Sequence, residues 1–171
     1  YSRNRYVSGA IRQRWIETVA VNSADTERPP PEVIQQMMTG SNQFLAEARS
    51  AGVKMMAGTD VPTTGTFFGF SLHDELALLV GTYGMTPMEA LRSATAIPAV
   101  FMGMDADVGT IEPGKWADLL LLDADPLVDI RNTKRIDTVI ADGRVFDSAA
   151  RERLLSEIEA AVAATGTGSG S

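Results

Sequence analysis

The stretch Val53-Lys54-Met55-Met56-Ala57-Gly58-Thr59-Asp60 is a short apolar run that ends in a glycine-containing turn and an acidic residue. An apolar run of this length between two helical patterns predicts a strand over residues 53–57, buried between helices. Barrel enzymes keep catalytic groups at the C-terminal ends of such strands. Asp60 is therefore a candidate catalytic residue. The alternative reading of the same residues is that Asp60 only caps the loop before Val61-Pro62.

A strong helical pattern precedes this stretch. It begins at Pro31, which suits the first position of a helix, and ends at Gly52, which suits a left-handed cap. Residues 1–28 differ in character, because they are more basic than the rest of the chain. They hold a weaker helical pattern at 11–21, and a loop or linker follows at 22–31.

Helical patterns also follow the stretch. An irregular loop over residues 61–70 leads to a helix that Ser71 can cap and that has a stripe of leucines. Thr86-Pro87-Met88-Glu89 is a capping box with proline at the first helical position. A last short helix is expected over residues 98–102.

From Val108 onward the period changes from helical to strand-like. Glu112-Pro113-Gly114-Lys115 predicts a type II turn, and Ala141-Asp142-Gly143 predicts a hairpin. The pattern indicates three strands, a helix and a disordered Gly/Ser/Thr tail, over residues 117–122, 136–140, 144–146, 150–164 and 165–171.

Composition excludes several classes of function. The chain has 171 residues, no cysteine, one histidine and a net charge of −7. It therefore cannot form disulfides, use thiol catalysis or build by itself a metal site on two imidazoles. The negative charge argues against a nucleic-acid partner. No apolar run is long enough to predict a membrane span, and the absence of cysteine and of a visible signal segment favours the cytoplasm.

His73 is the second candidate site residue. Its position puts it at the edge of the apolar stripe of the helix that starts at Ser71. It can orient a substrate in a site shared with the loop at 61–70, or it can simply bridge core and solvent. The neighbouring Asp74 and Glu75 are explained by the helix dipole and suggest no function.

Several motifs in fixed order point to a known family. They are Ala51-Gly52-Val53-Lys54 with Ala57-Gly58-Thr59-Asp60, Leu72-His73-Asp74-Glu75-Leu76, Met85-Thr86-Pro87-Met88-Glu89-Ala90-Leu91 with Ala94-Thr95, Gly109-Thr110-Ile111-Glu112-Pro113-Gly114-Lys115 with Ala117-Asp118-Leu119, and Asp125-Pro126-Leu127 with Asp142-Gly143-Arg144. Over residues 31–147 the chain thus resembles the amidohydrolase superfamily, and most of all its imidazolonepropionase-like and Xaa-Pro dipeptidase-like branch.

The resemblance implies an α/β fold: the C-terminal part of a (β/α)8 TIM-like barrel, half of a small β-sandwich domain and a C-terminal helix. Residues 1–107 would be the barrel part with its eighth strand at 53–57, residues 108–147 the β-domain strands, and residues 148–171 the terminal helix and disordered tail.

The resemblance also implies a function, hydrolysis of a C–N bond in a small-molecule amide, cyclic amide or dipeptide-like substrate. In such enzymes the residue matching Asp60 binds a divalent metal, usually one or two zinc ions. It also takes a proton from the metal-bound water and passes it to the leaving amine. His73 matches a histidine often seen in this branch and is not counted as a metal ligand. A homo-oligomeric full-length protein is compatible with the resemblance.

The chain also departs from the family. The His-x-His pair, the bridging Lys or Glu and two further metal-binding histidines would all precede Tyr1, and a full barrel takes about 250 residues. We therefore expect a C-terminal fragment that is inactive alone, lacks a tight zinc site, exposes barrel and sheet edges and tends to aggregate.

Two alternatives stay open from the sequence. One is a deaminase or deacetylase of the same superfamily. The other is a non-enzymatic domain for packing or partner binding. An in-frame His-x-His encoded upstream of Tyr1 would favour an enzyme, and a start codon at that point the non-enzymatic domain.

Overall fold

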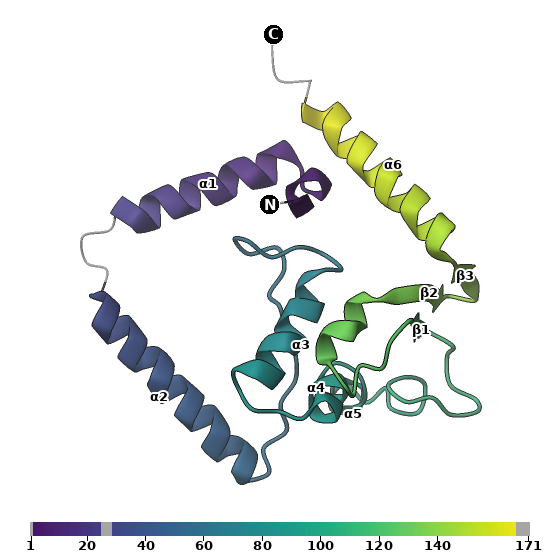
Figure 1. Cartoon of the computed structure of the whole chain (residues 1–171), viewed down its shortest axis with the longest axis horizontal. Helices are drawn as coiled ribbons and strands as arrows, with labels where there is room; N and C mark the ends of the chain where they lie inside the picture. Colours follow the sequence, from purple (N-terminus) through teal and green to yellow (C-terminus); the bar gives the residue numbers. More distant parts are fainter. Residues whose placement is uncertain (1, 25–28, 167–171) are drawn as a thin grey trace.

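The computed structural model describes residues 2–24 and 29–166 (Figure 1). Long helices lie at the outside and surround an inner group of short helices and a small sheet. The elements follow in the order η1 (Ser2–Tyr6), α1 (Gly9–Ala24), α2 (Pro31–Ser50), α3 (Ser71–Gly81), α4 (Pro87–Ser93), α5 (Ala96–Phe101), β1 (Leu119–Leu122), η2 (Ile130–Lys134), β2 (Ile136–Ala141), β3 (Arg144–Phe146) and α6 (Ser148–Gly166). The expected mixture of helices and strands is confirmed.

The core lies between α3, α4 and η2. Its buried members come from all three elements and the loop between α3 and α4, and they are Leu76, Leu79, Met85, Ala90 and Ile130. The predicted capping box of α4 is present, because the Thr86 side chain accepts from the Glu89 amide while the Glu89 carboxylate accepts from the Thr86 amide. Local sequence patterns thus predict the structure correctly where the apolar face of a helix packs against other parts of the same chain.

Ser71 plays a different part from the cap predicted for it. Helix α3 begins at Ser71 itself, and the residue before it, Phe70, caps nothing with its side chain. The Ser71 hydroxyl instead accepts a hydrogen bond of 2.8 Å from the Phe67 amide. The physical reason is that the turn at 67–71 folds back on the helix, so that the hydroxyl satisfies an amide of the loop rather than one of the helix.

Helix α2 begins at Pro31 as predicted, and Gly52 beyond its end has φ +83°, the left-handed conformation expected of it. Its apolar stripe, however, has little cover: Phe44 is 68% exposed. Helix α1 runs to Ala24 and is longer than the predicted segment at 11–21. Part of the predicted loop, residues 25–28, lies outside the described residues.

The sheet is antiparallel with the strand order β1-β2-β3. Asp142 and Gly143 have φ values of +51° and +69° and form the tight turn between β2 and β3, as the hairpin prediction requires. Leu120 of β1 is 52% exposed, and these three strands form a single sheet with no second sheet packed on it in the part of the chain that the structure describes. The predicted half-sandwich is therefore not confirmed. Helix α6 continues through residues 165 and 166, which were predicted to be disordered, and residues 167–171 lie outside the described part.

The strand predicted at residues 53–57 does not form. The segment is extended, and no strand pairs with it among the described residues. Burial nevertheless alternates as in a strand, since Met55 and Ala57 pack against the core while Lys54 and Met56 are exposed. The physical reason is that a strand needs neighbours to accept its backbone hydrogen bonds, and helices cover only one face of this segment. The assignment to an eighth barrel strand stays a prediction.

Candidate active site around Asp60

Asp60 lies in a turn directly after the extended segment. The residue is exposed, and its φ of +50° is in the left-handed region that few residues other than glycine adopt. Its carbonyl accepts a hydrogen bond of 3.0 Å from the Thr63 amide, which closes the turn. This conformation costs free energy in residues other than glycine and persists only where the surrounding structure maintains it. Such residues are often found at functional sites.

Two consecutive amides tie the chain before Asp60 to the helices. The Ala57 amide donates to the Ser93 carbonyl at the end of α4, at 3.0 Å. The Gly58 amide donates to the Glu75 carboxylate on α3, at 2.6 Å. A Cβ at position 58 would meet nothing within 4 Å, so this approach does not itself require glycine. The turn at Asp60 is therefore fixed through α3 and α4 rather than through a sheet.

Sequence reasoning missed the part played by Glu75, because it explained this carboxylate by the helix dipole. The signal that could have revealed it is its position. Glu75 is the fifth residue of α3, beyond the first turn, where the dipole effect is already weak.

The N-terminal segment packs on the loop that follows Asp60. The Trp15 ring meets Phe67 edge to face with 5.4 Å between centroids, and its indole N–H donates to the Pro62 carbonyl. Tyr6 stacks on Phe70 at 5.5 Å. These contacts bring η1 and α1 next to the loop that follows Asp60, although the contacting residues are 52 and 64 positions apart in the sequence. A substrate site shared by this loop and His73 stays a prediction.

His73 is half-buried on α3, and its Nδ1 atom is buried without a hydrogen-bond partner among residues 2–24 and 29–166. Burial, and then the positive charge of Lys134, lowers the pKa of this imidazole below 6.5, so His73 is neutral at pH 7. No hydrogen bond or ion pair joins His73 to Asp60 in the described structure. The role of His73 stays a prediction.

Asp74 occupies the other side of this helical turn. Its carboxylate pairs with Arg3 of η1 and with Lys134 of η2. The hydrogen bond from Arg3, followed by that from Lys134, lowers the pKa of Asp74 to about 2. The carboxylate links the N-terminal segment, α3 and η2. Its low pKa keeps it ionised near neutral pH, so it is not suited to exchange protons there.

A metal centre does not fit the described residues taken alone. Nowhere in them do three side chains of His, Cys, Asp or Glu come close enough to share an ion. Asp60 can supply one carboxylate oxygen ligand, and the other ligands of any such centre would have to come from elsewhere. The role of Asp60 as a metal ligand stays a prediction.

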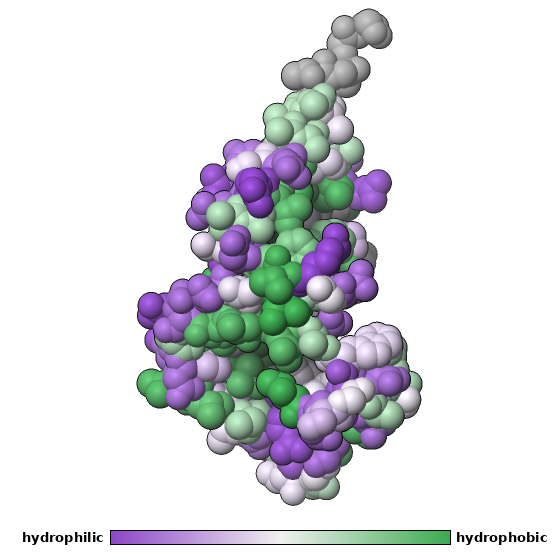
Figure 2. Space-filling view, turned by 90° about the vertical axis from the view of Figure 1, so that its right-hand side faces the viewer, coloured by the Kyte–Doolittle hydropathy of each residue, from purple (hydrophilic) through white to green (hydrophobic). Residues whose placement is uncertain are grey.

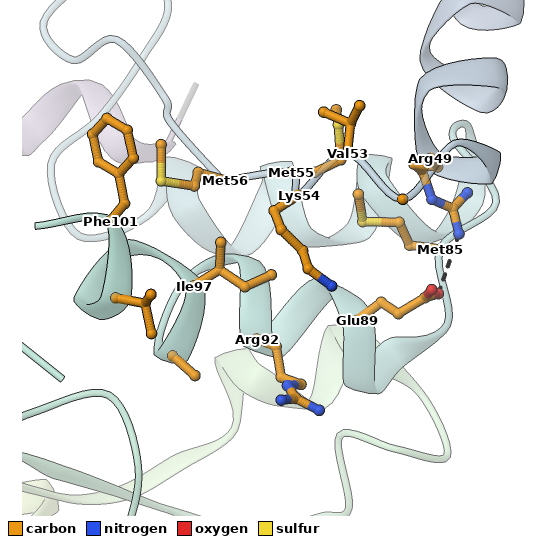
Figure 3. A pocket seen from close by; sticks show the side chains of 13 residues that line it. Arg49, Val53, Lys54, Met55, Met56, Met85, Glu89, Arg92, Ile97 and Phe101 are labelled. Carbon is orange, nitrogen blue, oxygen red and sulfur yellow. Dashed lines mark hydrogen bonds and ion pairs between the residues drawn. The ribbon is translucent and has the colours of Figure 1, made fainter.

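A separate groove of about 650 Å³ lies between residues 52–56 and the helices α4 and α5. Figure 3 shows its largely apolar lining, and an ion pair of 3.2 Å between Arg49 and Glu89 closes one end. The side chains seen around it include Met55, Met56, Met85, Ile97 and Phe101. Asp60 does not line this groove.

Apolar side chains are also gathered on the outer surface. Figure 2 shows them as a band down the middle of one face, bordered by polar residues. Over the whole surface of the described residues, the exposed apolar side chains include Phe101 and Val145, at 76% and 66%. In the part of the chain that the structure describes, no helix combines the length and the apolar character that crossing a membrane requires.

The sequence model of the amidohydrolase family matches residues 37–146, a range that includes the Asp60 turn, its anchors and the sheet. The chain belongs to the amidohydrolase family. The imidazolonepropionase of Shouchella clausii is a relative with 35% identity over 123 residues, which cover 66% of this chain and 27% of that protein.

Solved structures of other amidohydrolases agree with this assignment. A Xaa-Pro dipeptidase with bound methionine superimposes with a TM-score of 0.55 at 32% identity, over 63% of this chain and 25% of the other. The ochratoxinase of Aspergillus niger superimposes with a TM-score of 0.60 at 27% identity, over 80% of this chain and 31% of the other. This amidohydrolase chain thus spans between a quarter and a third of the length of these relatives.

Proposed function

We propose that the chain is the C-terminal part of a metal-dependent hydrolase that cleaves a C–N bond in a small-molecule amide, cyclic amide or dipeptide-like substrate. The observation that carries the proposal is the Asp60 turn: an exposed carboxylate, held at φ +50°, inside the range that the amidohydrolase family model matches. The names of the relatives, an imidazolonepropionase, a Xaa-Pro dipeptidase and an ochratoxinase, support this bond type.

In this proposal Asp60 contributes one ligand to a divalent metal, zinc by family precedent, and accepts a proton during hydrolysis. A metal ion supplies activation of the attacking water. The chain's own contribution is to position this carboxylate. The Ala57 and Gly58 amides donate hydrogen bonds and the Asp60 carbonyl accepts one, and together these bonds fix the backbone that carries the side chain. A carboxylate that is already oriented loses little conformational entropy on reaching the transition state.

The test is complementation. The chain is fused behind the N-terminal three-quarters of the S. clausii imidazolonepropionase and assayed with zinc against cyclic-amide, amide and dipeptide substrates. The chain alone is expected to be inactive. Asp60→Asn in the fusion should lower kcat by about 10²-fold or more with unchanged circular dichroism, as loss of a general base does.

Asp137→Asn is the matched control, since that carboxylate is exposed and, among the described residues, accepts a hydrogen bond only from the neighbouring Thr138 hydroxyl. It should keep full turnover and zinc content. Equal turnover of the Asp60→Asn and parent fusions would refute the role of Asp60. A folded, zinc-loaded fusion that cleaves none of the three substrate types would refute the proposed activity.

A further inference from the structure

The Gly58 amide and the Glu75 carboxylate form a link between two segments 17 residues apart. The N···O distance of 2.6 Å is short for an amide donor, as is usual when the acceptor carries a charge. The link comes two residues before Asp60, and the next backbone hydrogen bond, from the Thr63 amide to the Asp60 carbonyl, comes after it. The left-handed residue is therefore held between two fixed points.

The two oxygens of the Glu75 carboxylate differ in their surroundings. Oε1 accepts from the Gly58 amide, whereas Oε2 is buried and has no hydrogen-bond partner in the described part of the chain. Burying a polar atom without a partner costs free energy, so Glu75 is not simply a solvated surface residue. Asp74, its neighbour on α3, does the opposite and pairs with two cations.

We propose that Glu75 is a positioning residue for Asp60: its carboxylate holds the Gly58 amide and so fixes the turn that presents the catalytic side chain. The catalytic consequence rests on the proposed function, but the structural one does not. Without the link, the hydrogen bond that still ties this side of the turn to the helices, among the described residues, is the one from the Ala57 amide to the Ser93 carbonyl.

The first experiment measures the link in the chain itself. Amide hydrogen exchange and chemical shifts of Gly58 and Asp60 are followed by NMR in the parent, Glu75→Ala and Glu75→Gln. Loss of a hydrogen bond to a charged acceptor should speed exchange at Gly58 by about tenfold or more in Glu75→Ala and shift the Asp60 resonances. Glu75→Gln should preserve both, because its amide oxygen can accept from Gly58.

Asp74→Ala is the matched control. It removes a carboxylate from the same turn of α3 and lowers stability, but it should leave the Gly58 exchange rate unchanged after correction for global unfolding. Unaltered Gly58 exchange and Asp60 shifts in Glu75→Ala would overturn the proposal, whatever the activity.

The second experiment uses the hydrolase fusion. Glu75→Ala should lower kcat by about tenfold with KM nearly unchanged, because a mispositioned carboxylate affects the reaction more than substrate binding. Glu75→Gln should restore kcat. A rise in KM alone, or no rescue by glutamine, would overturn the positioning role. If Asp60→Asn retains turnover, the proposed function fails, and the exchange result at Gly58 still decides the link.

Discussion

Two regions of the molecule obey the same sequence rules with different results. In the inner region, made of α3, α4 and η2, apolar faces cover one another, and Leu76 is only 4% exposed. In the outer region, made of α2 and residues 53–60, the same kinds of pattern leave Phe44 68% exposed and produce no strand. The periodicity of apolar residues predicts which face of a helix or strand tends to be buried. It does not predict which other part of the protein packs on that face.

The largest test of this contrast is a pair of truncations. Leu76→Ala should lower the free energy of unfolding by about 2–5 kcal/mol, because it leaves a cavity in a packed core. Phe44→Ala should change it by no more than about 0.5 kcal/mol, since most of the ring already contacts solvent. Urea unfolding followed by circular dichroism measures both. Equal losses would show that α2 is covered in solution.

A pair of glycines tests the contrast at the backbone. A Cβ at Gly109, with φ +95°, would lie 2.6 Å from the Ala99 Cβ, whereas a Cβ at Gly52, with φ +83°, would meet nothing within 4 Å. Gly109→Ala should cost about 2–3 kcal/mol through both overlap and the left-handed backbone. Gly52→Ala should cost about 1 kcal/mol through the backbone alone. Thermal unfolding would contradict this if Gly52→Ala proved the more damaging.

The ion pairs of Asp74 bind the N-terminal segment to the inner region and give a pH-dependent test. A carboxylate whose folded pKa is depressed stabilises the fold above its ordinary pKa of 3.8, and the contribution is lost as the pH falls towards about 2. Because Asp74 is 40% exposed, solvent screening limits its contribution to about 1 kcal/mol.

Asp74→Asn should therefore lose about 1 kcal/mol at pH 7, and the difference from the parent should shrink below pH 4. Asp137→Asn should show no such difference at either pH. A gap for Asp74→Asn that stays constant with pH, in urea unfolding, would contradict the ion-pair origin.

The smallest expected effect is on the single histidine. NMR titration should give His73 a pKa below 6.5, since burial disfavours its charged form. Lys134→Met should raise this pKa and Asp74→Asn should lower it further, because each removes a charge that acts on the ring. A parent pKa above 6.5 would contradict the burial of His73. Shifts in the opposite directions would contradict the proposed effects of Lys134 and Asp74 on the ring.

Much of the fold followed from short-range rules. The capping box at Thr86 and Glu89 and the turn at Asp142 and Gly143 each depend on residues within three positions, and both are as predicted. The strand predicted at 53–57 did not form because no strand pairs with this segment among the described residues.

The candidate site shows the same limit. Asp60 could be singled out from its neighbours, but its anchor on Glu75 is 17 residues away. The contact of Trp15 with Phe67 joins residues that are 52 positions apart, so it leaves no signature in the local sequence. Residue type and spacing thus identified the carboxylate, and only the three-dimensional arrangement identified what holds it.

The packing of Trp15 on the loop after Asp60 has a practical consequence. The chain contains two tryptophans, and the other, Trp116, is 58% exposed. In a Trp116→Phe variant, all indole emission would come from a ring in contact with Phe67 and the Pro62 carbonyl. The molecule thus carries its own fluorophore at the edge of the candidate site. Its emission maximum can report whether the N-terminal segment stays docked when a metal, a substrate or the rest of a barrel is added.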